Sequence, residues 1–113
     1  MSIELKTAAT LHRYADRVVE RSNHHAANVL AVFPALLGYV TTYADPRSIK
    51  VREMLGETAN MGWATFGGRR IAFVYSHARE RIEARERTLR GAVLQAFDNR
   101  TSLQTLQSFF ASL

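Results

Sequence analysis

The sequence of 113 residues contains no cysteine. Disulfide bonds, thiolate metal sites and cysteine nucleophiles are therefore excluded. A chain without cysteine suits a reducing compartment, so we expect the protein to be cytoplasmic.

Long uninterrupted apolar runs are also absent. The longest apolar stretch, residues 26–43, is broken by Asn28, Pro34, Gly38 and two threonines, so it does not predict a membrane span. Residues 1–6 lack the basic start and the apolar core of a signal peptide. We therefore expect a soluble protein without a membrane partner.

Acidic residues are fewer than basic ones, ten against fifteen, and the net charge is +5. A basic balance invites a nucleic-acid partner. The thirteen arginines are nevertheless spread along the chain and interleaved with glutamates, so they form no single basic block. The apolar fraction of 47% is ordinary for a globular protein, and the length fits one domain over residues 1–113.

Hydrophobic periodicity predicts helices at the N-terminal end. Residues 3–22 carry apolar side chains at spacings of three and four, as an amphipathic helix does. Ser22-Asn23 either interrupts this helix or caps a second one over residues 24–33. Because Pro34 has no amide hydrogen, we expect the helix to end before it, with a strand over Tyr39–Tyr43.

The middle of the chain predicts strands. Residues 45–56 are ambiguous, because Asp45-Pro46 and Gly56 would bound a helix while Ile49 and Val51 alternate with charged neighbours; a strand is favoured. Gly67-Gly68 separates residues 61–66 from residues 69–76 and predicts a tight β-hairpin. Its expected register pairs Phe66 with Arg69, Ala64 with Ile71, Gly62 with Phe73, Trp63 with Ala72, and Met61 with Val74.

The C-terminal third predicts two helices. Residues 78–97 contain Glu83–Arg87 and Glu86–Arg90 pairs at helical spacing. Asp98-Asn99 would end this helix. Thr101 or Ser102 would cap a last one, whose shared apolar face consists of Leu103, Leu106, Phe110 and Leu113.

Together the elements predict an α+β fold. It comprises an N-terminal helix or helices, a small antiparallel β-meander of three or four strands, and two C-terminal helices packed on one face. Both faces of the hairpin are apolar, so the second face would be covered by further structure or by another subunit.

Two sets of polar residues are candidate sites. In a meander, Glu53 and His77 could face a common pocket with Trp63 and Tyr75 and serve as an acid–base pair. The glycine turn and the arginine-rich stretch Arg79–Arg90 suit phosphates, and the candidate anion or nucleic-acid contacts are Arg69, Arg70, Arg81 and Arg85. The plain alternatives are ordinary hydrogen-bonded side chains, a solvated hairpin edge and a salt-bridged helix surface.

Aromatic residues suggest a third candidate. Adjacent residues of a helix point in different directions, so Phe109 and Phe110 should not both face one core. With Trp63 they form a candidate oligomer interface, against the alternative of a tail helix with one semi-exposed ring.

No catalytic motif is present. His12 and Asp16 stand one helical turn apart, but no metal-binding signature occurs, and we expect neither a metal nor a cofactor. The leading hypothesis is a small homo-oligomeric binding module without catalysis, whose partner is itself, another protein or a small molecule. The alternatives are a nucleic-acid-binding accessory protein that uses an arginine-rich helix, and a small enzyme or ligand-pocket protein.

Overall fold

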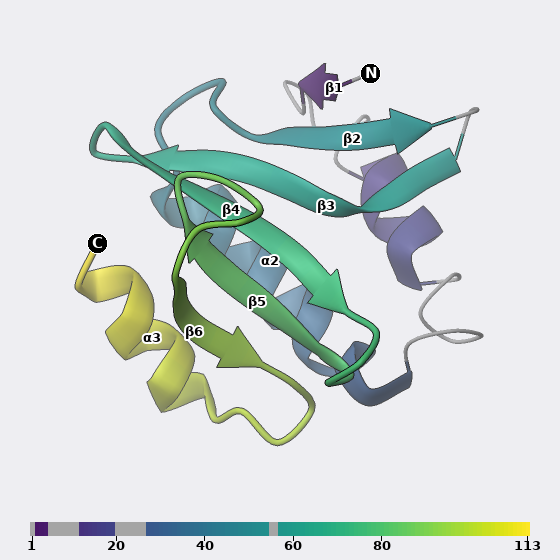
Figure 1. The fold of residues 1–113 in the computed structure, drawn as a ribbon. Helices are drawn as coiled ribbons and strands as arrows, with labels where there is room; N and C mark the ends of the chain where they lie inside the picture. Colours follow the sequence, from purple (N-terminus) through teal and green to yellow (C-terminus); the bar gives the residue numbers. More distant parts are fainter. Residues whose placement is uncertain (1, 5–11, 20–26, 55–56) are drawn as a thin grey trace.

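The computed structural model describes residues 2–4, 12–19, 27–54 and 57–113 (Figure 1). Its centre is one antiparallel sheet whose strands follow one another in chain order. They are β1 (Ser2–Glu4), β2 (Lys50–Met54), β3 (Glu57–Phe66), β4 (Arg69–Ser76), β5 (Arg81–Glu86) and β6 (Val93–Phe97). The α+β class and the antiparallel meander are thus confirmed, with six strands in place of the three or four expected.

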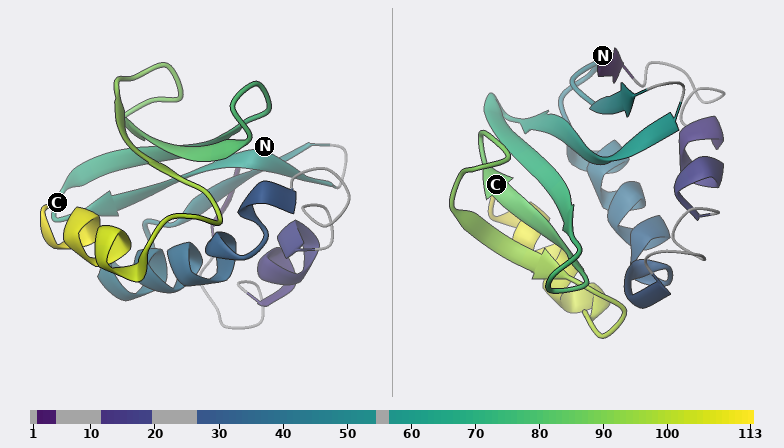
Figure 2. Two further views of the ribbon diagram at one scale, coloured as in Figure 1. Left: turned by 90° about the horizontal axis from the view of Figure 1, so that it is seen from below. Right: turned by 45° about the vertical axis from the view of Figure 1, so that its right-hand side comes forward.

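Helices cover one side of this sheet. They are a helix over residues 12–19, the short 3-10 helix η1 (Ala27–Val29), α2 (Val32–Tyr43) and α3 (Leu103–Ala111). Figure 2 (left) shows α2 and α3 beneath the sheet, while the loops from β4 to β5 and from β5 to β6 rise on the opposite side. One side of the sheet therefore carries the core, and the other has no described helix over it.

The hydrophobic core lies between the sheet and the helices. Ile71, Ala84 and Phe97 are fully buried there. The sheet contributes Ala64, Phe66, Ile71, Ile82, Ala84 and Phe97, and the helices contribute Val29, Val32, Phe33, Leu36, Val40, Leu106, Phe109 and Phe110.

The predicted hairpin is confirmed. Gly67 and Gly68 have φ angles of 58° and 86°, which other residues seldom adopt and which a two-residue turn requires. Strands β3 and β4 pair in the expected register, Trp63 opposite Ala72 among them. The ambiguous segment is also a strand where β2 lies, and Arg47 forms the turn before it at a φ of 63°.

The strand predicted over Tyr39–Tyr43 is wrong, because α2 runs through it. Buried Val32, Leu36 and Val40 recur every fourth residue, so burial on one helical face overrides the strand preference of valine, threonine and tyrosine. Pro34 does not end the helix either. It occupies the first turn, where its missing amide hydrogen breaks no helical bond.

The long helix predicted over residues 78–97 is also wrong, since β5 and β6 occupy most of it. Ile82 and Ala84 face the core while Arg81, Glu83 and Arg85 face away, which is a period of two instead of 3.6. The sequence does not mark the turns on either side of β5, because Glu80 and Arg87 adopt the positive φ angles of 51° and 66° there in place of glycine. A single C-terminal helix therefore remains where two were expected.

The last helix begins as predicted. Ser102 is the N-cap of α3, and its hydroxyl accepts a hydrogen bond from the Thr105 amide at 3.1 Å. Of the predicted apolar face, Leu106 and Phe110 are buried, whereas Leu103 is 66% exposed. At the N-terminal end, residues 12–19 of the helix predicted over 3–22 are helical, Ser2–Glu4 is a strand, and the rest lies outside the described residues.

A side chain far away in sequence caps α2. Ala31, its own N-cap residue, makes no side-chain cap hydrogen bond. The side-chain oxygen of Asn99 accepts instead from the Ala31 amide at 2.8 Å and the Val32 amide at 3.1 Å. Its side-chain nitrogen donates to the Ala27 carbonyl at 2.8 Å. The loop before α3 is therefore fastened to the start of α2.

Among the described residues, no helix is both long enough and apolar enough to span a membrane.

Candidate functional site

The side of the sheet that faces away from the helices has a defined set of side chains. Strand register places Lys50 opposite Trp63, Trp63 opposite Ala72, and Ala72 opposite Arg85, so these side chains share one face. We call this the open face. Among the described side chains it comprises Lys50, Arg52, Met61, Trp63, Thr65, Arg70, Ala72, Val74, Ser76, Arg81, Glu83, Arg85, Val93 and Ala96.

The open face is strongly basic. Five of its described side chains are cations, and Glu83 is the one carboxylate among those described. The register also places Glu4 of β1 opposite Lys50. Lys50, Arg52 and Arg70 are exposed. Arg52 lies beside Met61, with its Nη1 atom 3.6 Å from the sulfur. Because the cations come from β2, β4 and β5, they gather only when the sheet forms.

Glu83 lies at the centre of the arginine cluster and is 1% exposed. Arg85 Nη2 donates to one of its carboxylate oxygens at 2.5 Å, and Arg81 Nε donates to the other at 2.9 Å. Arg79 Nη1 lies 3.7 Å from the second oxygen. Arg85 Nη1 also donates to the Gly91 carbonyl at 3.1 Å, which ties the cluster to the loop before β6.

The ionised form of Glu83 is stabilised by these neighbours. Burial alone would raise the pKa of Glu83, but hydrogen bonds from Arg85 and Arg81 and their positive charge outweigh it. The pKa of Glu83 therefore lies below its ordinary value, and the carboxylate is charged at neutral pH. The cluster of one carboxylate and three guanidinium groups has a net positive charge.

Trp63 lies on the neighbouring part of the same face. The Arg70 guanidinium carbon stands 5.4 Å from the centre of its ring, a cation–π contact. Between Trp63 on β3 and Arg85 on β5, strand β4 presents the small side chain of Ala72. The open face thus combines an aromatic ring and a row of guanidinium groups, with the buried side chain of Ala72 between them.

The anion site expected at the glycine turn already holds an anion of the protein. The Asp45 carboxylate accepts hydrogen bonds from the Gly67 amide at 2.8 Å and the Gly68 amide at 3.0 Å. These bonds, that from Gly68 first, hold the pKa of Asp45 below its ordinary value. The turn amides are therefore occupied, so the turn is no phosphate cradle.

Arg69 and Arg70 separate to opposite sides of the hairpin. Arg69 makes two hydrogen bonds to Glu86, of 2.6 and 3.1 Å, and the bond from Arg69 lowers the pKa of Glu86. Arg70 belongs to the open face, as do Arg81 and Arg85. Three of the four predicted anion contacts therefore lie on one face, on strands and not on the predicted helix. Arg85 is near Arg70, whereas Arg81 is opposite Ser76 at the other end of β4.

Two residues of the predicted pocket, Trp63 and Tyr75, lie on opposite sides of the sheet. Trp63 is on the open face, whereas Tyr75 lies on the other side of β4 and packs against the core. The ring of His77 contacts the ring of Tyr75 edge-on, with centroids 4.9 Å apart. The Glu53 side chain lies outside the described residues.

Phe109 and Phe110 are both buried, so the expectation that the two rings would not both face the core is wrong. Helix α3 fits between α2 and β6, and its two rings therefore reach different neighbours. The Phe110 ring packs against Tyr39 with centroids 5.6 Å apart, and the Phe109 ring meets Phe97 edge-on at 5.5 Å. Neither ring is available as an exposed contact surface.

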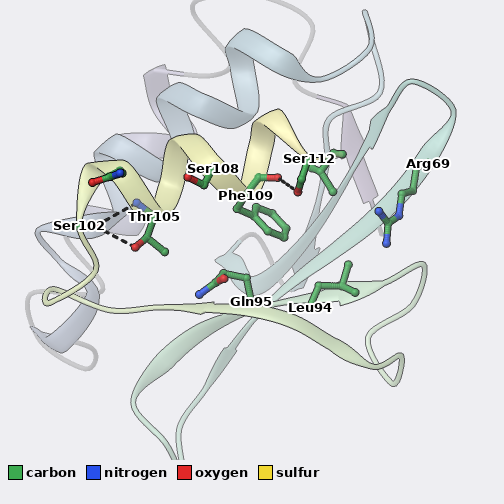
Figure 3. A pocket seen from close by; sticks show the side chains of 10 residues that line it. Arg69, Leu94, Gln95, Ser102, Thr105, Ser108, Phe109 and Ser112 are labelled. Carbon is green, nitrogen blue, oxygen red and sulfur yellow. Dashed lines mark hydrogen bonds between the residues drawn. The ribbon is translucent and has the colours of Figure 1, made fainter.

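A hollow with a volume of about 610 Å³ lies between β6 and α3 (Figure 3). Phe109 points from α3 toward β6, where Leu94 and Gln95 form the opposite wall. Its lining consists of Arg69, Leu94, Gln95, Ser102, Gln104, Thr105, Ser108, Phe109, Ser112 and Leu113. Arg69 is the one charged side chain of this lining, and Glu86 already neutralises it. The hollow is thus polar but carries no acid–base pair.

Metal-binding residues do not cluster in the described part of the chain. No group of three or more histidine, aspartate or glutamate side chains is placed there to hold an ion. His12 and Asp16 lie 3.6 Å apart as an exposed pair on the helix over residues 12–19.

Comparison with known proteins gives a family. The family model described as "Integron cassette protein VCH_CASS1 chain" matches residues 11–107, which is most of the chain. The chain belongs to this family. The description of this integron cassette protein family names no activity, and no curated protein matches the chain.

Proposed function

We propose that this integron cassette protein is a nucleic-acid-binding module and that the open face of the sheet is its binding surface. The observation that carries the proposal is that Lys50, Arg52, Arg70, Arg81 and Arg85 share with Trp63 the face of the sheet that no described helix covers. Guanidinium and ammonium groups bind phosphates, and tryptophan and arginine planes stack on bases. The surface therefore offers both kinds of contact that a nucleic acid needs.

Self-association through the same face is less favourable. Two copies pressed together there would bring five cations against five, and like charges in contact oppose binding. Phe109 and Phe110, the other reason to expect an oligomer, are used in the core. An anionic polymer would be attracted to these cations instead of repelled. We therefore prefer a nucleic acid to a second copy of this protein as the partner of the open face.

Trp63 allows a direct test, because it is the one tryptophan of the chain. A short oligonucleotide is titrated into the protein while the Trp63 fluorescence is recorded. We expect saturable quenching, because a base stacks near the indole. The apparent affinity should fall as salt rises from about 50 to about 200 mM, with a logarithmic slope of about −0.7 for each phosphate contact.

A matched pair of charge reversals tests the location. Arg70→Glu reverses a charge beside Trp63, and Arg100→Glu reverses one in the loop before α3, away from the open face. We expect Arg70→Glu to weaken binding about tenfold and to flatten the salt dependence, whereas Arg100→Glu has a much smaller effect. Equal effects of the two variants would place the ligand elsewhere. Quenching by an acidic peptide but by no oligonucleotide would replace nucleic acid by protein as the partner.

A further inference from the structure

The arginine cluster around Glu83 defines how a ligand would lie on the open face. We infer that the ligand is a single strand laid along β5, with phosphates on Arg81 and Arg85 and bases turned toward Trp63, and that Glu83 positions the two arginines. This inference rests on the proposed function.

Glu83 holds the two guanidinium groups side by side. Arg85 binds one carboxylate oxygen at 2.5 Å and Arg81 binds the other at 2.8 to 2.9 Å, so both arginines converge on one point from opposite directions along β5. Two guanidinium groups brought this close would otherwise repel each other. The carboxylate therefore holds the two guanidinium groups in place, and each guanidinium group is suited to bind one of two successive phosphates.

A phosphate would meet the arginines and not the carboxylate. Glu83 is 1% exposed, whereas the side chains of Arg81 and Arg85 are 29% and 26% exposed. A guanidinium group has five N–H donors, more than either arginine uses on Glu83 and Gly91. Arg85 Nε is buried, so the remaining Nη hydrogens and the net positive charge of the cluster are what an incoming phosphate would meet.

The distance to Trp63 favours a single strand. Neighbouring strands are about 4.8 Å apart, so Trp63 on β3 lies about 10 Å across the sheet from Arg85 on β5. Ala72, between them on β4, is fully buried, so the Trp63 and Arg85 side chains that flank it, and not Ala72 itself, would contact the ligand. An unpaired base whose phosphate sits on β5 can turn toward the Trp63 ring. The bases of a duplex are paired and stacked inside it, so they cannot do so.

Glu83→Gln distinguishes an effect of total charge from an effect of arginine positioning, because the two predict opposite changes in oligonucleotide affinity. The substitution keeps the size of the side chain but raises the net charge of the protein from +5 to +6. If only total charge mattered, oligonucleotides would bind more tightly. If Glu83 positions Arg81 and Arg85, binding weakens about tenfold, because the two guanidinium groups separate and one charge-assisted contact is lost.

Glu80→Gln is the matched control. Glu80 is exposed in the turn before β5 and undergoes the same change of charge. We expect it to bind oligothymidylate as tightly as the unchanged protein or slightly more tightly. Weaker binding by Glu83→Gln together with unweakened binding by Glu80→Gln supports the inference, and equal or tighter binding by Glu83→Gln overturns it.

Two further measurements complete the experiment. If circular dichroism shows that Glu83→Gln does not fold, Arg85→Lys is measured instead. This substitution keeps the positive charge but removes the paired N–H donors of the guanidinium group, so binding should weaken about tenfold. Unchanged binding by Arg85→Lys overturns the inference. A duplex that binds as tightly as oligothymidylate and quenches Trp63 equally also overturns it. Failure of the unchanged protein to bind either nucleic acid would instead refute the proposed function itself.

Discussion

Asn99 is expected to stabilise the fold far more than an exposed loop residue normally does. Its side chain accepts hydrogen bonds from the first amides of α2, at Ala31 and Val32, and donates one to the carbonyl of Ala27. Replacing Asn99 by alanine removes all three bonds. The start of α2 then has no side-chain cap, because Ala31 supplies none.

The loss of stability in Asn99→Ala follows from these three hydrogen bonds. Loss of an N-cap destabilises a protein by about 1 kcal/mol, and loss of a further hydrogen bond by about 1 kcal/mol more. We therefore expect Asn99→Ala to lower the free energy of unfolding by about 2 kcal/mol. An unfolding entropy of about 2.1 cal/mol/K per residue over 113 residues converts this loss to a fall in Tm of about 8 °C.

Urea unfolding followed by circular dichroism measures the free energy directly. Arg100→Ala is the control, since Arg100 is the exposed neighbour in the same loop and its substitution should change stability by less than about 0.5 kcal/mol. Asn99→Asp keeps an acceptor for the α2 amides but loses the donor to Ala27, so about half of the loss is expected. If Asn99→Ala were as stable as Arg100→Ala, the interpretation of Asn99 as the cap of α2 would be refuted.

Three other predictions concern stability. Gly91→Ala should lower the free energy of unfolding in urea by well over about 1 kcal/mol, because a Cβ atom there overlaps the carbonyl oxygen of Glu86. An unchanged urea midpoint would contradict this. Ser102→Ala should cost about 1 kcal/mol in thermal unfolding through loss of the bond from Thr105, and Ser102→Asp should cost less. Folding lowers the pKa of Glu83, so the ionised Glu83 stabilises the fold at pH values above the ordinary glutamate pKa of about 4.3. This stabilisation is lost as the pH falls through the folded-state pKa. The urea midpoint measured against pH should therefore fall less on the acid side in Glu83→Gln than in the parent protein.

The hairpin and the last helix were predictable because their determinants are local. Gly67-Gly68 admits the positive φ angles of a tight turn, and the two-residue loop then sets the register of β3 and β4. Ser102 caps α3 through an amide only three residues away. Such contacts form within a few residues, so a reader of the sequence can see both partners.

The sequence by itself also determined the composition of the candidate site, but not its assembly. Trp63, Arg70, Arg81 and Arg85 stand out as aromatic and cationic residues, yet they were assigned to three different kinds of site. The alternation of Ile82 and Ala84 with charged residues is a short sign of a strand, but Glu83 and the arginines around it are good helix formers. The turns that bound β5 contain residues with positive φ angles that are not glycine, so no turn signal marks them.

Tertiary structure decided what these residues can do together. Burial of Ile82 and Ala84 against the helices turned β5 into a strand, which directed Arg81, Glu83 and Arg85 to the opposite side. Pairing across β4 then brought this row beside Trp63. The physical reason is that side-chain packing over long sequence separations outweighs local propensity, and only the folded sheet brings those partners together.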